Sequence, residues 1–216
     1  LRIESRFLVN LNEKHMRKHR DQLCNEEGCS EIWFDEDVQL AHYKLPANCK
    51  FIGQTLLQTK FRSNYGCNIL QITTPQTVID MPGADYILEA ASTLLIIGTR
   101  EQFKMFNAAV ASKQIDLEPL AEPISLRQFM LQSHEEKPEL QFLSLAITVD
   151  EHSKLLGKSI KDANIRENWS ALVLGLERGA YTITNPNISL TFEKGDLLWV
   201  LGKQKMLNAL IREEVL

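Results

Sequence analysis

The sequence predicts an α/β fold built from two tandem copies of one small domain. The chain has 216 residues, which is room for two domains of roughly 100 residues each. A shift of 104 residues aligns residues 51–107 with residues 155–211 without a gap, and nine of the 57 aligned pairs are identical. Each copy combines apolar residues at helical spacing with short apolar runs of strand length. We therefore expect each copy to be a small mixed sheet with helices.

Several of the identical pairs are residues that set the local backbone conformation, because glycine permits a positive φ and proline fixes φ. They include glycines and prolines at matching places: Gly53 and Gly157, Pro82 and Pro186, and Gly98 and Gly202. Residue classes match as well, because Thr55 aligns with Ser159. This agreement indicates that one domain was duplicated, and we call residues 51–107 copy one and residues 155–211 copy two.

The elements of each copy follow one another in the same order. A short helix opens near residues 53 and 157, where Thr55 and Ser159 are placed to cap it. Strands are expected at residues 67–73, 77–80 and 93–97 of copy one, and at 171–177, 181–184 and 197–201 of copy two. A last helix is expected at residues 101–106 and 205–211. Before its last strand, copy one has Glu89-Ala-Ala-Ser92 where copy two has Glu193-Lys-Gly-Asp196, which puts the tight turn of copy one in doubt.

Two regions lie outside the copies. Residues 1–35 are expected to form a helical segment, because Ile3, Phe7, Leu8 and Leu11 share one apolar face. The expected division is a helical segment at 1–35, a first domain at 36–109, a helical linker at 110–138 with a helix near residue 126, and a second domain at 139–216. The chain begins on Leu rather than Met, so we expect it to be a piece of a longer protein.

Composition excludes several classes of function. Lys and Arg number 24 and Asp and Glu 28, so the net charge is −4. This balance argues against a protein that binds nucleic acid or anionic membranes through a basic surface. No apolar run approaches the roughly 18 residues of a membrane span. Four cysteines in 216 residues predict a reducing compartment rather than a disulfide scaffold.

The spacing of glycine, arginine and proline residues in each copy resembles the TrkA-C domain, also called RCK-C, a ligand-binding module of proteins that regulate potassium conductance. The resemblance rests on Gly-x-Thr/Ser-Leu/Ile, a following Arg, Pro after the second strand, and a last strand that ends in Gly. Copy two matches best at its end, with Glu193-Lys-Gly-Asp-Leu-Leu-Trp-Val-Leu-Gly202. Residues 3–13 resemble the juxtamembrane helix of some bacterial cation:proton antiporters that carry tandem TrkA-C domains. A Gly-x-Gly-x-x-Gly motif is absent from the sequence, so no dinucleotide fold is implied.

The resemblance implies a ligand site between two TrkA-C domains of a homodimer. In members that bind cyclic di-AMP, apolar residues, an Arg on the first helix and an Asn six residues later line the pocket. Copy one has this pattern in Leu56, Leu57, Arg62 and Asn68. Copy two has Leu172 in place of the Asn, so we expect copy one to bind the ligand. The alternative is that Arg62 and its counterpart Arg166 are surface arginines that pair with carboxylates.

Other candidate sites are less specific. Asp80, Asp85 and Glu89 could offer oxygen ligands to a cation, although carboxylates spaced in this way are usually solvated. A zinc site could use His15, His19, Cys24 and Cys29, but the cysteines are further apart than is usual. We find neither a Gly-x-Ser-x-Gly nor a His-Glu-x-x-His motif and expect no enzyme.

We therefore expect a cytoplasmic, ligand-sensing region of a cation transporter. The resemblance favours a cation:proton antiporter whose membrane transport domain belongs to the same polypeptide, with no resident cofactor, with cyclic di-AMP or another nucleotide as regulatory ligand, and with no nucleic acid as partner. A homodimer is expected to form through the first helix and nearby strands of the TrkA-C domains. The alternative is an assembly module of an anion or dicarboxylate exchanger that binds no ligand. A transcription regulator is disfavoured, because residues 1–30 lack a helix-turn-helix pattern.

Overall fold

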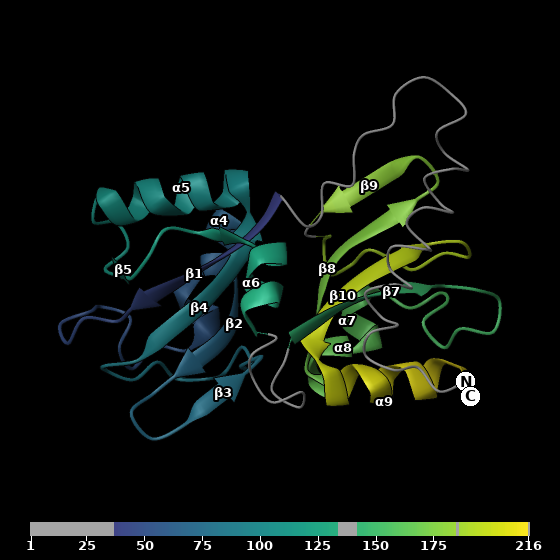
Figure 1. Cartoon of the computed structure of the whole chain (residues 1–216), viewed down its shortest axis with the longest axis horizontal. Helices are drawn as coiled ribbons and strands as arrows, with labels where there is room; N and C mark the ends of the chain where they lie inside the picture. The colour runs from purple at the N-terminus through teal and green to yellow at the C-terminus, as the bar shows by residue number, and fades with distance from the viewer. Residues whose placement is uncertain (1–36, 134–141, 185, 216) are drawn as a thin grey trace. The chain divides into compact units, whose positions relative to one another are not determined.

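The computed structural model describes residues 37–133, 142–184 and 186–215 of the chain (Figure 1). The chain divides into two compact units, with the boundary between Lys137 and Pro138. Each unit has its own antiparallel sheet, its own helices and its own apolar core. This confirms the predicted mixed α/β class. The expected helical segment at residues 1–35 and the four candidate zinc ligands lie outside the described residues.

The sheet of the first unit has the strand order β3-β2-β4-β1-β5, and β6 also pairs with β1. Its strands are β1 (Val38–Lys44), β2 (Asn68–Thr73), β3 (Val78–Asp80), β4 (Thr93–Thr99), β5 (Glu118–Pro119) and β6 (Ile124–Ser125). We expected a mixed sheet, but every strand pair in the described residues is antiparallel. The reason is that β4 lies between β1 and β2, which run in the same direction, and pairs antiparallel with both.

The helices of the first unit are α3 (Leu56–Thr59), α4 (Phe61–Tyr65), α5 (Arg100–Ala111) and α6 (Leu126–Ser133). The single short helix expected near residue 53 is in fact two helical turns, α3 and α4. They are separated by Lys60, whose φ of 56° is left-handed. This break in the helix places the next residue, Phe61, in the core.

Aromatic rings form the centre of the first core. Phe106 of α5 makes edge-to-face contacts with three of them: Tyr43, Phe61 and Tyr65, at centroid distances of 5.2, 5.7 and 5.6 Å. Tyr43 also donates a hydrogen bond to Asn107 Oδ1 over 2.5 Å. Edge-to-face pairs each add roughly 0.5–1.5 kcal/mol beyond the apolar area that they bury. The core thus ties β1, α4 and α5 together behind the sheet.

In the residues that the structure describes, the second unit repeats this arrangement without counterparts of β5 and β6. Its sheet has the order β7-β10-β8-β9. Its elements are β7 (Phe142–Thr148), α7 (Ile160–Ala163), α8 (Ile165–Trp169), β8 (Ala171–Arg178), β9 (Tyr181–Thr184), β10 (Leu197–Lys203) and α9 (Gln204–Val215). The break between α7 and α8 falls at Asn164, with a φ of 49°. It corresponds to Lys60 of the first unit.

The irregular features of the two units coincide. In each sheet a bulge interrupts the pairing of the second strand, at Leu70 in β2 and at Leu174 in β8, and these leucines are one of the identical pairs. The predicted caps are confirmed, because Thr55 and Ser159 each accept a backbone hydrogen bond at the start of their helix. The turn that was in doubt in copy one is present: Ala91 adopts a φ of 59° where Gly195 has 92°.

The segment 110–138 does more than connect the copies. We expected a helical linker, and α6 lies within it. However, the same segment also supplies β5 and β6, which pair with the outer edge of β1. Tyr43 of β1 is opposite Pro119, and Gln39 is opposite Ser125. The first sheet therefore has a covered edge that is formed by the chain downstream of its last helix.

Candidate functional site

The candidate site of copy one is built around the start of α3. Thr55 and Gln58 form a capping box, in which the Thr55 backbone N–H donates to Gln58 Oε1 over 2.8 Å and the Gln58 backbone N–H donates to Thr55 Oγ1 over 3.3 Å. The backbone N–H of Leu57 also donates to Ala84 O over 2.8 Å. Because both ends of this turn are bonded, the two leucines that follow Thr55 have fixed directions.

Leu56 and Leu57 point to different surroundings. Leu56 is partly buried and packs against the core of the first unit. Leu57 is 72% exposed, so its apolar side chain is open to contact from outside the domain. The matching position of copy two holds Lys161, which is also exposed. Copy one therefore presents an apolar contact at a place where copy two presents a charge.

Arg62 follows the break in the helix and points away from the core. Its side chain is exposed, and no carboxylate in the described part of the chain pairs with it. Partial burial lowers the pKa of Arg62, but the guanidinium stays charged at neutral pH. The alternative, in which Arg62 is held by a neighbouring carboxylate, finds no support among the described residues.

Asn68 is the first residue of β2 and is only 8% exposed. It is paired with Ile97, so its side chain lies on the sheet face opposite to that of Ile69, a core residue. Its side-chain amide makes no hydrogen bond with any residue that the structure describes. Because neither polar atom of this amide is both enclosed and unbonded, the amide still reaches water. The amide group is thus available to a ligand or to a second chain.

Arg62 and Asn68 lie on two sides of the corner where α4 meets β2. The corner is closed by Gly66, which has a φ of 71° and donates its N–H to Arg62 O over 2.9 Å. Among the described contacts, none joins the side chains of Leu56, Leu57, Arg62 and Asn68 to one another. Arg62 and Asn68 therefore flank this corner, Leu57 belongs to the preceding helical turn, α3, and the four residues do not form a closed pocket.

The same corner of copy two has a different chemistry. Arg166 takes the place of Arg62 but is partly buried. Leu172 takes the place of Asn68 and is 6% exposed, so that position cannot offer a hydrogen bond. With Lys161 in place of Leu57, copy two lacks both the apolar contact and the amide.

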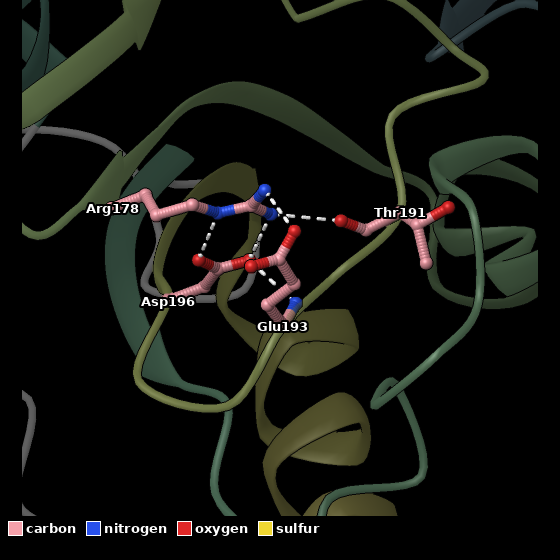
Figure 2. A network of polar contacts seen from close by, with 4 residues as sticks. All are labelled: Arg178, Thr191, Glu193 and Asp196. Atoms are coloured by element: carbon pink, nitrogen blue, oxygen red, sulfur yellow. Dashed lines mark hydrogen bonds and ion pairs between the residues drawn. The ribbon is translucent and has the colours of Figure 1, made fainter.

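Copy two instead has a polar network that the sequence did not reveal (Figure 2). The guanidinium of Arg178, at the end of β8, donates from Nε and Nη2 to Oδ1 and Oδ2 of Asp196, each over 2.8 Å. Its Nη2 also donates to Thr191 O over 2.8 Å, and its Nη1 contacts Glu193 Oε1. The hydrogen bonds to Asp196 are the main cause of a raised pKa of Arg178. The negative charges of Asp196 and Glu193 act in the same direction, whereas burial lowers the pKa.

Asp196 anchors the loop in front of β10. Its side chain is fully buried, and Oδ2 also accepts the backbone N–H of Glu193 over 2.8 Å. Thr191 forms an isolated bridge with Ser159 at the start of α7. The network therefore connects β8, the loop and the first helix of the second unit. The sequence signals that could have found it are Asp196 in its turn and Arg178 at the end of a strand.

Copy one has no counterpart to this network. Thr74 stands where copy two has Arg178, and Ser92 stands in place of Asp196. Thr74 turns back on its own hairpin, accepting the backbone N–H of Thr77 over 3.0 Å. The Ser92 Oγ is buried and has no hydrogen-bond partner among the described residues. The loop in front of β4 is thus held by backbone contacts, such as the one from Leu45 N–H to Ser92 O, rather than by an ion pair.

The weaker candidates for metal binding do not assemble. Asp80 accepts a hydrogen bond from Gln71 Nε2 over 2.7 Å, while Asp85 and Glu89 are exposed. Within the ranges that the structure covers, no three His, Cys, Asp or Glu side chains come close enough to hold a metal ion. Within the same ranges, no helix has the length and apolar character needed to cross a membrane.

Comparisons with known proteins agree with the duplicated fold. An uncharacterized transporter of Synechocystis sp. (strain ATCC 27184 / PCC 6803 / Kazusa), sll0640, is 26% identical over 162 residues, which is 74% of this chain and 25% of that protein. The Ktr system potassium uptake protein A of Vibrio alginolyticus is 28% identical over 134 residues, which is 62% of this chain and 49% of that protein. This chain thus spans a quarter to a half of the length of these relatives.

The solved structure of the RCK C domain of potassium transport protein KtrA in complex with cyclic diadenosine monophosphate is also similar. It is 24% identical, with a TM-score of 0.33, and the match covers 40% of this chain and 92% of that chain. The TrkA-C domain family matches this chain twice, over residues 40–111 and 145–214. Together these segments make up well over half of the chain, and the protein therefore belongs to the TrkA-C family, with two TrkA-C domains in tandem.

Proposed function

We propose that this chain is the regulatory region of a cation transporter and that its first TrkA-C domain binds a cyclic dinucleotide, cyclic di-AMP. Membership of the TrkA-C family supports a regulatory role. Similarity to a potassium uptake protein supports a link to cation transport. The transporter is a cation:proton antiporter whose membrane part belongs to the same polypeptide, and the chain lies on the cytoplasmic side of the membrane.

One observation carries the ligand assignment. An exposed arginine without a described carboxylate partner, Arg62, and a buried amide without a described hydrogen bond, Asn68, flank one corner in copy one. The matching corner of copy two has kept the arginine and lost the amide. An Asn amide that has no partner in the described protein can bond to a ligand phosphate or base edge in place of water.

The ligand chemistry follows from the side chains. A guanidinium offers a planar pair of donors that fits two phosphate oxygens. An Asn amide offers both a donor and an acceptor, and the exposed Leu57 can pack against a purine. Cyclic di-AMP has two phosphates related by a twofold axis. A homodimer formed through the first helices of two copies would present one Arg62 to each phosphate.

Regulation then follows from linkage. A ligand that binds one arrangement of the dimer better than another shifts the equilibrium toward it, by no more than its differential affinity. A coupling free energy of about 1–3 kcal/mol is typical and changes the odds of a state roughly 5–150-fold. That range is enough to switch transport on or off without a large rearrangement inside either domain.

Calorimetry of the 216-residue chain with cyclic di-AMP tests the proposal. We expect binding that Arg62→Ala weakens about tenfold or more, since a charged hydrogen bond contributes roughly 1.5–3 kcal/mol. The matched control is Arg166→Ala in copy two, which should leave the affinity unchanged. Equal effects of the two substitutions would refute the assignment to copy one. The absence of binding would favour the assembly module of an anion or dicarboxylate exchanger.

A further inference from the structure

The loop in front of the last strand is fastened differently in the two copies. It runs over residues 84–92 in copy one and 188–196 in copy two, and we call these segments loop one and loop two. In loop two the Asp196 carboxylate binds Arg178 of β8 and accepts the backbone N–H of Glu193 (Figure 2). A buried ion pair therefore ties loop two to its own sheet.

Loop two also has backbone hydrogen bonds that loop one lacks. The N–H groups of Gly195 and Asp196 donate to Val149 O and Glu193 O over 2.8 and 3.1 Å. The aligned residues of loop one make neither bond with the residues that the structure describes. Both loops keep only the 2.8 Å bond from the end of the first strand to the carbonyl of the last loop residue. Loop one thus has fewer contacts with its sheet than loop two.

Two residues of loop one are also placed unfavourably. Ser92 is fully buried, and its Oγ has no hydrogen-bond partner among the described residues. Ala91 has a left-handed φ of 59° without being a glycine. A buried hydroxyl without a partner and a strained alanine both make the closed loop less favourable. Loop one should therefore open locally more often than loop two.

Loop one supports the beginning of the first helix of copy one. Ala84 O and Tyr86 O accept the backbone N–H groups of Leu57 and Leu56 over 2.8 and 3.0 Å. Opening of the loop breaks these bonds and releases the turn that carries Leu57. Because Leu57 is the exposed apolar contact of the proposed ligand site, the state of the loop determines whether this leucine is presented to a ligand.

We propose that loop one is a closing element of the ligand site, which opens locally in the free chain and closes when cyclic di-AMP binds. The Arg178–Asp196 pair keeps loop two closed in both states. The inference rests on the proposed function for the identity of the ligand. A ligand that packs against Leu57 binds the closed loop better than the open loop, and this difference in affinity shifts the equilibrium. The duplication thus leaves one domain that responds and one that is locked.

Hydrogen exchange of the full chain without ligand tests the difference between the loops. Four equivalent N–H groups at the contact of loop and helix are hydrogen-bonded over 2.8 to 3.0 Å in each copy, and we call them the contact amides. They belong to Gly53, Leu56, Leu57 and Leu88 in copy one and to Gly157, Ile160, Lys161 and Phe192 in copy two. The protection factors of the copy-one set should be about tenfold lower than those of copy two, and lower than those of β4. Equal protection of the two sets, or of the copy-one set and β4, would overturn the proposal.

Exchange in the presence of ligand tests the closure. Cyclic di-AMP at about 100 times its Kd should slow the contact amides of copy one roughly tenfold or more. The contact amides of copy two are the matched control and should not change. If calorimetry shows binding that depends on Arg62 while these amides do not slow, the closure is wrong and the proposed function stands. If cyclic di-AMP does not bind, the proposed function is wrong, and exchange of the free chain alone decides whether loop one opens.

Transfer of the ion pair gives a second test. Thr74→Arg together with Ser92→Asp places in copy one the two residues that hold loop two. The contact amides of copy one should then exchange about tenfold more slowly without ligand. The affinity for cyclic di-AMP should be equal or higher, because the ligand binds the closed loop. Ser92→Asp alone is the control and should not slow exchange, since a buried carboxylate without its cation is unfavourable. A folded double variant with unchanged exchange, or with weaker binding, would contradict the proposal.

The reciprocal change in copy two keeps the test decisive if the double variant does not fold. Arg178→Thr together with Asp196→Ser copies the residues of copy one and leaves no buried charge behind. The contact amides of copy two should then exchange about tenfold faster, while those of copy one stay the same. Unchanged exchange in copy two would show that the ion pair does not hold the loop and would refute the proposal.

Discussion

Arg178 and Asp196 form a two-point ion pair in which the carboxylate is fully buried, with both nitrogen–oxygen distances at 2.8 Å. The pair joins the end of β8 to the residue in front of β10, eighteen positions later in the chain. The aligned residues of copy one, Thr74 and Ser92, cannot form an ion pair. The duplicated domains thus share a fold but hold the same loop by different means.

The ion pair should make a large contribution to the stability of the second domain. Arg178→Ala leaves the Asp196 carboxylate buried without its cation, which typically costs about 3–5 kcal/mol. We expect a loss of about that size in the free energy of unfolding of this domain, measured by urea denaturation. The matched control is Lys194→Ala, which removes the exposed ion pair to Glu151 and should cost under ~1 kcal/mol. Similar losses for both variants would contradict this account.

The buried thiol of Cys67 should make stability depend on alkaline pH. Burial raises the pKa of Cys67 from 9.0 to about 12, so the folded state favours the neutral thiol. The resulting stabilisation is complete below pH 9 and is lost between pH 9 and pH 12. Between pH 8 and pH 10 the loss should be on the order of 1 kcal/mol. Unfolding of Cys67→Ala, which copies Ala171 of copy two, should lack this part of the pH dependence, and an unchanged slope would exclude the thiol as its source.

The amide of Asn68 should matter for the ligand more than for the fold. Asn68→Leu copies Leu172 of copy two and removes a buried polar group that has no described hydrogen bond. We expect stability to change little, since the amide makes no described hydrogen bond that the substitution would remove. Calorimetric affinity for cyclic di-AMP should fall about tenfold. A variant that binds as tightly as the natural chain would show that the amide does not contact the ligand.

The turn before the last strand allows a reciprocal test. Ala91 adopts a left-handed φ of 59°, where copy two has Gly195. Ala91→Gly should stabilise the first domain by about 1 kcal/mol, because glycine avoids the steric cost of this conformation. Gly195→Ala should destabilise the second domain by a similar amount, since no atom lies within 4 Å of the added methyl group and only the backbone cost remains. Thermal unfolding measures both, and shifts of the same sign would contradict the explanation.

The predictable part of the structure was its repeated local pattern. Strand positions, the last helices and the caps at Thr55 and Ser159 followed from apolar spacing and from residue types with strong local preferences. The helix break at Lys60 could not be predicted in this way, because Lys has no preference for a left-handed backbone, whereas Asn164 is of a type that tolerates it. The breaks form because Phe61 and Ile165 become buried in their cores.

Parts of the site that depend on distant residues were also beyond local reasoning. The position of Asn68 on the sheet face away from the core depends on its pairing with Ile97. The coverage of β1 by β5 depends on chain that follows the repeat, and we had assigned that chain to a linker. Neither relation leaves a periodic signal in the sequence, since each is a pairing between segments far apart in the chain.

The sequence by itself determined that one α/β domain occurs twice and belongs to the TrkA-C family, because glycine, proline, capping and apolar positions act through local backbone geometry. Only the tertiary structure decided which side chains remain available. It left Leu57 exposed and the amide of Asn68 without a described partner, while it paired Asp196 with Arg178. The physical reason is that burial and hydrogen bonding are satisfied between elements, so they depend on how the strands and helices meet.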